Sequence, residues 1–254
     1  MSDSLRQALA DGALQVVFQP IFDVSLSHLA LHGVEALVRG PAGTPYEDAG
    51  FLFDEVARRG DEVWADRACV AAIMAAAGEL PPGLPVGVNV YAATLARDPD
   101  FPRFVQDTAQ GAGLLPERLV LEVGRAGAVS DSRLLRAPLE ALRANGMAVA
   151  LDDVGLGQAS YRTMLECRPD FFKLDGFVVK GAGLDPLRQA VVRSLVVLAD
   201  GFGARVVAEW IEEPGDLHTV KGLGVTLVQG RLFLGARPAR EMDVDLDSLD
   251  AAAS

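Results

Sequence analysis

The sequence predicts an α/β fold, a (β/α)8 TIM-like barrel whose first strand runs antiparallel to its neighbour. Three observations carry this prediction: eight strand-like runs along 254 residues, helical patterns between most of them, and one connection too short for a helix. Roughly 250 residues is also a typical length for a single barrel of this kind. The runs are rich in β-branched or alternating apolar residues and cover 14–22, 29–39, 85–91, 118–124, 147–153, 171–175, 205–210 and 225–230.

The connection between the first two runs is the stretch DVSLSH at 23–28. A parallel crossover needs about a dozen residues or more, so this stretch predicts an antiparallel pair. Later connections are longer and show helical periodicity, most clearly over 61–80, 131–146 and 185–203. The last of these has Asp185 as a good N-cap and Pro186 at the first helical position.

Composition and charge restrict the class of partner. The chain carries 23 Lys and Arg against 35 Asp and Glu, which gives a net charge of −12. Binding of a nucleic-acid polymer normally needs a basic face, so DNA and RNA are not expected, whereas a small anion held by metal ions is compatible with this charge. No internal repeat or low-complexity linker divides the sequence. We expect one domain over 1–254, with a core at about 14–238 and an acidic C-terminal tail at 239–254.

The N-terminal residues, the apolar helix candidates and the cysteines indicate in which compartment to expect the protein. The opening residues 1–12 are polar, unlike a signal peptide, and the most apolar helix candidate, 68–80, is shorter than the ~20 residues of a membrane span. Cys69 and Cys167 have no metal-ligand spacing and are too few for a disulfide framework. We therefore expect a soluble, cytoplasmic protein without a membrane span.

Polar side chains stand toward the ends of most predicted strands. Any one of them, taken alone, is most simply a polar residue at a strand terminus. Seven strands with such a residue are a stronger signal, because the carboxyl ends of barrel strands converge on one face, where catalytic groups lie. In strand order the residues are Glu35, Asn89, Glu122, Asp152, Asp153, Lys173, Asp175, Glu209 and Gln229.

The chemistry of these groups predicts a site for hard divalent cations. Carboxylate and amide oxygens, without a thiol or an evident His ligand, suit Mg²⁺ or Mn²⁺. The adjacent charges of Asp152 and Asp153 need a positive partner, and two metal ions would supply one. Two-metal sites of this kind assist the attack of water on a phosphodiester. Lys173 is suited to orient that water or to neutralise phosphate charge, and Glu209 to act as general base or second-metal ligand.

Seven segments, in order along the chain, resemble the EAL-domain cyclic di-GMP phosphodiesterase family. The signature Glu-Ala-Leu occurs at 35–37 within GVEALVR, and alone it would carry no weight. The ordered set is highly specific and extends from about residue 14 to residue 238. The other segments are VVFQPI at 16–21, VNVYAATL at 88–95, ALDDVGLG at 150–157, FFKLDGFVV at 171–179, VVAEWIEE at 206–213 and VQGRLF at 228–233.

The resemblance implies a barrel with an antiparallel first strand and the hydrolysis of cyclic di-GMP to linear pGpG with Mg²⁺ or Mn²⁺. It implies metal ligands at Glu35, Asn89, Glu122, Asp152, Asp153 and Glu209, with Asp152 shared between two metals. The implied catalytic groups are Glu35, Lys173 beside the attacking water, and Glu209. Substrate contacts and supporting positions, together with the strand-end Asp175, complete the expected site as Gln19, Arg39, Asp175, Glu212 and Gln229.

Several positions depart from the family pattern. Where the family has a second Glu that anchors the loop after strand five, this chain has Arg125, a reversal of charge. Trp210 replaces a glycine beside Glu209, where it either stacks on a guanine or blocks it. The loop at 154–158 lacks the usual Phe, Thr and aromatic residue and has instead Val154, Leu156 and Gln158.

These departures leave more than one function open. The complete ligand set favours an active phosphodiesterase, whose activity is weak or partner-dependent if the loop is degenerate. Arg125 and the loop favour the alternative, a catalytically inactive cyclic di-GMP receptor or protein-interaction signalling module. Another phosphodiester substrate on the same barrel is a third reading. The expected partners are cyclic di-GMP and, beyond it, a second copy of the chain or a regulatory protein.

Overall fold

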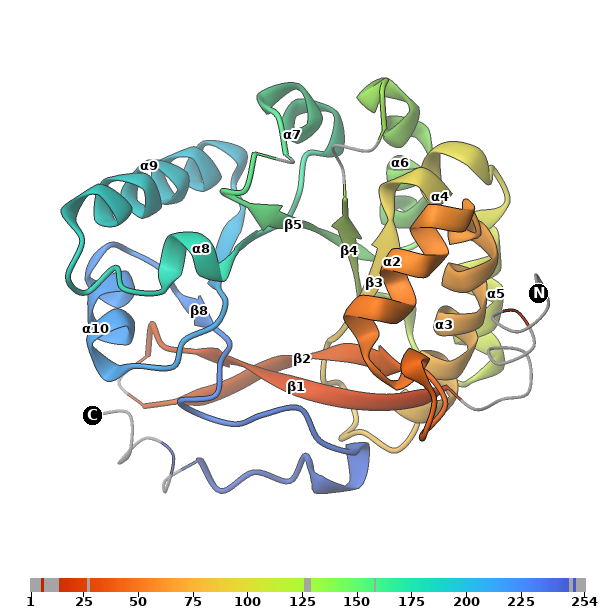
Figure 1. The fold of residues 1–254 in the computed structure, drawn as a ribbon, viewed down its shortest axis with the longest axis horizontal. Helices are drawn as coiled ribbons and strands as arrows, with labels where there is room; N and C mark the ends of the chain where they lie inside the picture. The colour runs from red at the N-terminus through yellow and green to blue at the C-terminus, as the bar shows by residue number, and fades with distance from the viewer. Residues whose placement is uncertain are drawn as a thin grey trace.

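The chain forms a closed ring of strands with helices around its outside (Figure 1). The structure, a computed structural model, describes residues 6, 14–26, 28–125, 129–157, 159–246 and 249. Within these residues eight strands follow one another around the barrel in chain order, which confirms the predicted fold class. Strands β1 to β8 are Gln15–Asp23, Ala30–Arg39, Val86–Tyr91, Leu119–Gly124, Ala148–Val154, Phe171–Leu174, Arg205–Ala208 and Leu227–Val228.

Helices lie in the connections between the parallel strands. The carboxylate of Asp185 accepts hydrogen bonds from the backbone N–H groups of Leu187 (2.8 Å) and Arg188 (3.4 Å), and Pro186 begins α9, so the predicted start of this helix is confirmed. In the part of the chain that the structure describes, no helix is both long and apolar enough to cross a membrane. The helices are α2 (Ala49–Arg59), α3 (Glu62–Ala77), α4 (Ala92–Arg97), α5 (Phe101–Gly111), α6 (Arg136–Ala144), α7 (Tyr161–Cys167), α8 (Gly176–Val179), α9 (Pro186–Phe202) and α10 (Pro214–Gly222), with 3₁₀ turns η1 (Pro45–Glu47), η2 (Pro116–Arg118), η4 (Ser132–Leu135) and η5 (Ala239–Glu241).

The first strand runs against both of its neighbours. β1 pairs antiparallel with β2 and with β8, whereas the other neighbouring strands pair parallel. This confirms the prediction from the short connection. The segment after β8 runs alongside β1 (Figure 1), where Phe18 and Arg237 exchange backbone hydrogen bonds of 2.7 and 2.9 Å. Phe233 and Met242 of this segment are buried. The β1–β2 hairpin has no crossover helix, so this segment covers the part of the barrel that such a helix would otherwise cover.

Apolar strand residues build the core between barrel and helices. Phe18, Phe22, Phe101 and Phe172 are fully buried, and they belong to one continuous apolar cluster. Strands of a barrel read as nearly continuous apolar runs because helices cover their outer face. Polar side chains are therefore placed inside the barrel or at its rim, which positions the candidate site.

Two of the strands are shorter than predicted. β7 ends at Ala208 instead of residue 210, because Trp210 has a φ of 58°, which a strand cannot contain. β8 is reduced to Leu227–Val228. Of the expected acidic tail, residues 247, 248 and 250–254 lie outside the described residues, as does Gln158 of the loop after β5.

Candidate active site

Four carboxylates from separate strands converge on one lysine inside the barrel. The Nζ atom of Lys173, on β6, lies 3.0 Å from Glu35 Oε2 on β2 and 2.9 Å from Glu209 Oε1 at the end of β7. It also forms an ion pair with Glu122 on β4 and lies 3.9 Å from Asp152 Oδ1 on β5. Lys173 is only 1% exposed, so a single buried cation holds these acids together.

Among these buried acids, Glu35 has the most hydrogen-bond donors around its carboxylate. Its two oxygens accept from Asn89 Nδ2 at 2.7 Å and from Gln229 Nε2 at 2.8 Å. Burial acts to raise the pKa of Glu35, but Lys173 and these two amides outweigh it and leave the pKa below its ordinary value. Glu35 therefore remains a carboxylate at neutral pH, and the amides of β3 and of the residue after β8 fix its direction.

The charge of Lys173 does not compensate for the burial of the other three acids, Glu122, Asp152 and Glu209. Burial raises the pKa of Glu122 to about 8, and it likewise raises the pKa values of Asp152 and Glu209. Burial acts to lower the pKa of Lys173, but the surrounding carboxylates raise it well above its ordinary value. The lysine is thus a permanent cation among more carboxyl groups than its single charge can keep ionised.

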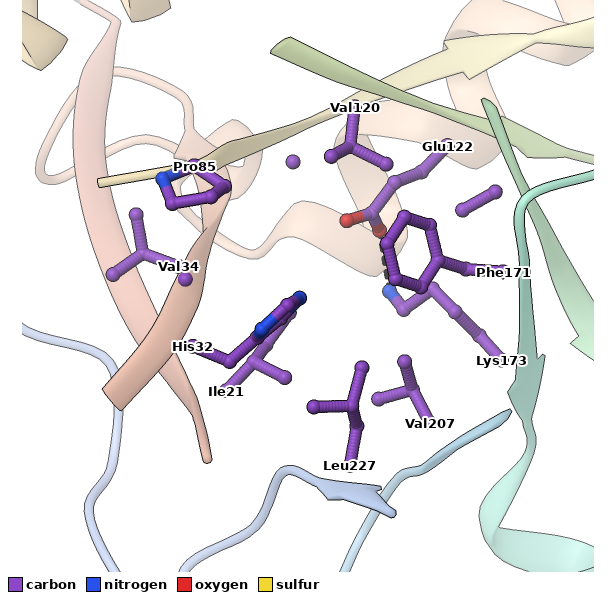
Figure 2. A pocket seen from close by; sticks show the side chains of 13 residues that line it. Ile21, His32, Val34, Pro85, Val120, Glu122, Phe171, Lys173, Val207 and Leu227 are labelled. Atoms are coloured by element: carbon purple, nitrogen blue, oxygen red, sulfur yellow. Dashed lines mark hydrogen bonds and ion pairs between the residues drawn. The ribbon is translucent and has the colours of Figure 1, made fainter. Parts of the chain in front are cut away.

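Apolar side chains form the floor below the ion pair of Glu122 and Lys173. This pair lines one side of a small cavity of about 30 Å³ whose other walls are mainly apolar. Figure 2 shows the side chains around it. Water is therefore scarce on this side, which explains the strong effect of burial on the carboxyl pKa values. The labelled apolar residues are Ile21, Val34, Pro85, Val120, Phe171, Val207 and Leu227, with His32 at the edge.

A glycine makes room for the carboxylate of Glu122. Gly87 lies on β3, and a Cβ atom at this position would stand 1.8 Å from Glu122 Oε1. No side chain fits there without moving the carboxylate. Sequence reasoning missed this residue, although a glycine inside an apolar strand is itself a signal of close approach.

An irregularity in β5 explains how two adjacent acids reach the same site. The pairing of β5 with β6 shifts register between Leu151 and Val154, and Asp153 has a φ of 55°. Neighbouring side chains of a regular strand point to opposite faces, but a bulge breaks this alternation. Burial and Asp152 raise the pKa of Asp153 to about 6. Lys173 Nζ lies 3.9 Å from Asp152 Oδ1, and the positive charges of Lys173 and Arg125 offset only part of the rise in the pKa of Asp153.

Strained backbone gathers around this rim. Among the described residues, the non-glycine positions with positive φ are Arg125, Asp153, Arg168 and Trp210. Three of these follow or end β4, β5 and β7 beside the acids, whereas Arg168 ends α7. A left-handed conformation costs about 1–3 kcal/mol for such residues and is concentrated at functional sites in proteins.

A cavity of about 320 Å³ opens next to the acids on the side of β2 to β5. Arg39 lines it together with Glu35, Asn89 and both aspartates of β5, as expected for a substrate contact. Arg125 also lines the cavity, with its guanidinium 5.6 Å from the ring centre of Tyr91 and 2.5 Å from Asp54 Oδ1. A negatively charged ligand of moderate size would meet two arginines here.

Asp66 is a second residue that sequence reasoning missed. It projects from α3 to the cavity wall, is 2% exposed, and accepts a hydrogen bond of 2.9 Å from the backbone N–H of Tyr91. Burial raises its pKa to about 8. An aspartate between Ala65 and Cys69 on the apolar side of a helix was the available signal.

Two predicted site residues have other contacts, and a third lies beside the cluster. Asp175 caps α8, accepting a hydrogen bond of 2.6 Å from Phe177 N. Glu212 forms ion pairs with Lys180 (3.2 Å) and Arg231 (2.7 Å) and does not join the cluster at Lys173. Gln19 lies opposite Glu35 in the β1–β2 pair, next to the cluster.

Comparison with known families identifies the barrel. The EAL domain family matches residues 2–238. The chain belongs to this family. The EAL match spans all eight strands and every acid of the cluster, so the resemblance noted in the sequence is confirmed.

Solved EAL structures share the fold. BlrP1 of Klebsiella pneumoniae, in a complex with manganese and cyclic di-GMP, is 30% identical and has a TM-score of 0.78 over 89% of this chain and 56% of that chain. The FimX EAL domain of Xanthomonas citri, in complex with cyclic di-GMP, is 20% identical with a TM-score of 0.83 over 96% and 95%. The second likeness supports the fold alone.

Curated EAL relatives are longer proteins. A signaling protein of Caulobacter vibrioides without an assigned function is 30% identical over 94% of this chain, and the probable cyclic di-GMP phosphodiesterase PdeA of Escherichia coli is 32% identical over 48%. The match covers 29% of the first protein and 17% of the second. The chain thus spans about a third or less of the length of these relatives.

The EAL acid cluster fits a divalent cation in its chemistry. Its donors are carboxylates and the amide of Asn89, the ligands that hard cations prefer, and the Oε1 atom of Gln229 is buried without a hydrogen-bond partner. Among the residues that the structure describes, no three His, Cys, Asp or Glu side chains are arranged to hold a metal as they stand. The carboxylates turn instead toward Lys173, whose ammonium group holds the central positive charge.

Proposed function

We propose that this chain hydrolyses cyclic di-GMP to linear pGpG. The observation that carries the proposal is the cluster of Glu35, Glu122, Asp152 and Glu209 around Lys173, inside the barrel of an EAL domain. The cavity beside it has Arg39 and Arg125 on its wall, which suits a ligand with two phosphodiester groups. A 30% identical relative holds cyclic di-GMP in its crystal structure.

The proposed cofactor is Mg²⁺ or Mn²⁺ at two positions. Glu35, Asn89, Glu122 and Asp152 would hold the first ion, and Asp152, Asp153 and Glu209 the second. When bound, such ions lower the pKa of water and stabilise the charge that develops on the phosphate. The excess of carboxylates over cations around Lys173 supports this assignment, because the ions would supply the missing charge.

The chain's own residues perform the remaining work. Lys173 is a fixed donor at the centre of the acids, and it orients the attacking water or the phosphate oxygen. Glu209, only 2.9 Å from Lys173, is placed to accept the proton of that water. Arg39 contacts a phosphate from the cavity wall with its forked donors. The water oxygen bonds to phosphorus as the ester bond to one ribose oxygen breaks, and a proton from solvent neutralises that oxygen and balances the one that Glu209 accepts.

One observation favours a second function, a receptor that binds cyclic di-GMP without cleaving it. Arg125 pairs with Asp54 on α2 and stacks near Tyr91, so it does not reproduce the acidic anchor expected for the loop after β5. If this loop no longer positions Asp153, the ligand would bind while turnover is lost. Residues 14–238 would serve either function as one unit. This unit would act alone, as a homodimer or under the control of a regulatory protein.

Incubation with cyclic di-GMP and Mn²⁺ tests both functions. We expect chromatography to show pGpG formed by the wild type, abolished in Glu35→Ala and retained in the control Glu79→Ala, whose exposed side chain lies after α3. Calorimetry with Ca²⁺ in place of Mn²⁺ measures binding separately. Binding without turnover would support the receptor, and absence of both would contradict the proposal.

A further inference from the structure

Trp210 occupies a conformation that its residue type disfavours. It follows Glu209 directly, has a φ of 58°, and is 52% exposed. A bulky side chain in the left-handed region is a genuine outlier, and an indole half open to solvent loses the favourable burial of its rings. Glycine, which the family pattern has here, would avoid both costs. The backbone and the exposure of Trp210 thus suggest a purpose other than packing.

The ring is held by one face against α8. A Cβ atom on Gly176 would stand 2.7 Å from Trp210 Cγ, so the indole lies directly on this glycine. Lys180 Nζ lies 4.4 Å from the ring centre, and Lys180 N donates a 2.9 Å hydrogen bond to Gly176 O. Gly176 and Lys180 are four residues apart and lie on the same side of α8, so α8 covers one side of the indole. Because Trp210 is 52% exposed, the side of the ring that faces away from α8 is open to solvent.

Lys180 is itself fixed, which makes the support rigid. Its ammonium group pairs with Glu212 at 3.2 Å, and Glu212 is held in turn by Arg231 at 2.7 Å. A cation over an indole adds an attraction that orients the ring. The aromatic plane is therefore preorganised before any ligand arrives.

The platform lies on the other side of the acids from the large cavity. Glu35 and Glu209 approach Lys173 from β2 and from the end of β7. The 320 Å³ cavity extends from Glu35 along β2 to β5, whereas Trp210 continues from Glu209 toward α8. A cyclic dinucleotide whose scissile phosphate is at the acids would extend one base toward each side.

We propose that Trp210 forms a base-stacking subsite, in which its free indole face binds one guanine of cyclic di-GMP while the other half of the ligand enters the cavity. This inference rests on the proposed function and adds to it a residue that contacts the ligand. Stacking on aromatic side chains tolerates any base, so hydrogen bonds elsewhere would select guanine.

The two tryptophans of the chain permit a direct test. Trp64 lies on α3 behind Tyr91 and does not itself line the cavity, so Trp64→Phe leaves Trp210 as the single fluorophore and Trp210→Phe leaves Trp64. Each protein is titrated with cyclic di-GMP in Ca²⁺, with calorimetry in parallel. We expect the ligand to quench the Trp64→Phe protein with the affinity found by calorimetry, and to leave the emission of Trp210→Phe nearly unchanged.

Two further variants separate stacking from folding. Trp210→Gly suits a φ of 58°, so it should fold at least as well as the wild type yet bind roughly tenfold or more weakly, as expected for the loss of one stacked base. Trp210→Phe keeps a ring and should retain most of the affinity. Equal or tighter binding by Trp210→Gly, or binding without quenching in Trp64→Phe, would overturn the subsite and leave the proposed function intact. If the wild type shows no binding in calorimetry, the proposed function itself fails.

Discussion

The Nζ atom of Lys173 lies 3.0 Å from the Oε2 atom of Glu35, although the two residues belong to strands on different sides of the barrel. Glu35 also accepts hydrogen bonds from the amides of Asn89 and Gln229, so this pair connects these two amides to the acids around Lys173. A divalent cation bound to these oxygens would share them with Lys173, so we expect the lysine and such an ion to compete for the carboxylates.

Replacement of Lys173 by Met is expected to destabilise the metal-free protein strongly. Four carboxylates would then share a site of low polarity without a cation, and breaking a buried ion pair from one side costs about 3–5 kcal/mol. Mn²⁺ should recover stability in this variant more than it stabilises the wild type. Thermal unfolding with and without Mn²⁺ measures both effects, with Lys221→Met on the exposed end of α10 as control. Equal shifts by Mn²⁺ in variant and wild type would contradict the competition.

Gly87→Ala should impair turnover while the barrel stays folded. The added methyl group would stand 1.8 Å from Glu122 Oε1, so the carboxylate must move from its place beside Lys173. Displacement of a catalytic group by about 1 Å can lower the rate about 100-fold. We expect a loss of this order in pGpG formation.

The matched control for this substitution is Gly201→Ala on α9, where the new methyl group meets no neighbour within 4 Å. Circular dichroism checks that both variants retain the barrel. Wild-type turnover in folded Gly87→Ala would show that Glu122 is not needed in its observed position.

Asp66 should make folding stability depend on pH. Burial raises the pKa of Asp66 to about 8 in the folded protein, while the unfolded chain has the ordinary value of about 4. The folded form therefore binds this proton more tightly, and the stability it contributes is lost as the pH rises between these two values. In Asp66→Asn the amide oxygen can still accept from Tyr91 N, but it does not titrate.

Urea unfolding of the metal-free proteins at pH 5, 6, 7 and 8 measures this effect. The acids at Lys173 contribute to the same trend, so the informative quantity is the difference between wild type and Asp66→Asn. We expect the wild type to lose on the order of 1–3 kcal/mol more than the variant across this range. The control is Asp107→Asn at an exposed position of α5. Parallel curves for wild type and Asp66→Asn would refute a buried, protonated Asp66.

The sequence predicted the barrel because its signals are local. Strand periodicity and one short connection suffice for eight strands and an antiparallel β1, and strand-end acids suffice to indicate which face holds the site. Side-chain directions are not local. Three features depend on register and curvature, which periodicity does not specify. They are the meeting of Lys173 with four acids, the bulge that lets Asp152 and Asp153 line the same cavity, and the space that Gly87 leaves for Glu122.

The same limit explains the predicted residues that lie elsewhere. Asp175 and Glu212 follow β6 and β7 in the sequence, as Glu209 does. The chain turns at once into α8 after Asp175, so its carboxylate serves as a helix cap, and Glu212 meets the cations Lys180 and Arg231. Proximity to a strand end predicts the face, whereas the partner of each acid depends on the loops.

Arg125→Glu should raise pGpG formation several-fold by restoring an acidic group after β4. In the structure the Arg125 guanidinium pairs with Asp54, whose side chain is 73% exposed, and a pair so open to water contributes at most about 1 kcal/mol. Its loss should therefore leave thermal stability nearly unchanged. The new carboxylate would stand at the cavity wall near the loop that begins after Val154, where it can accept backbone N–H groups and order that loop beside Asp153.

The control reverses the charge of a more exposed arginine away from the site. Arg133 on η4 is 71% exposed and pairs with Asp131, so Arg133→Glu changes the net charge of the chain by the same amount without touching the cavity. A rise in turnover for Arg125→Glu alone supports the loop as the limiting part of the enzyme. Unchanged or lower turnover would mean that Arg125 itself serves the ligand, because the cavity would have lost one of its two arginines. Calorimetry then decides between these roles, since loss of a phosphate contact weakens the binding of cyclic di-GMP, while an ordered loop leaves the affinity equal or higher.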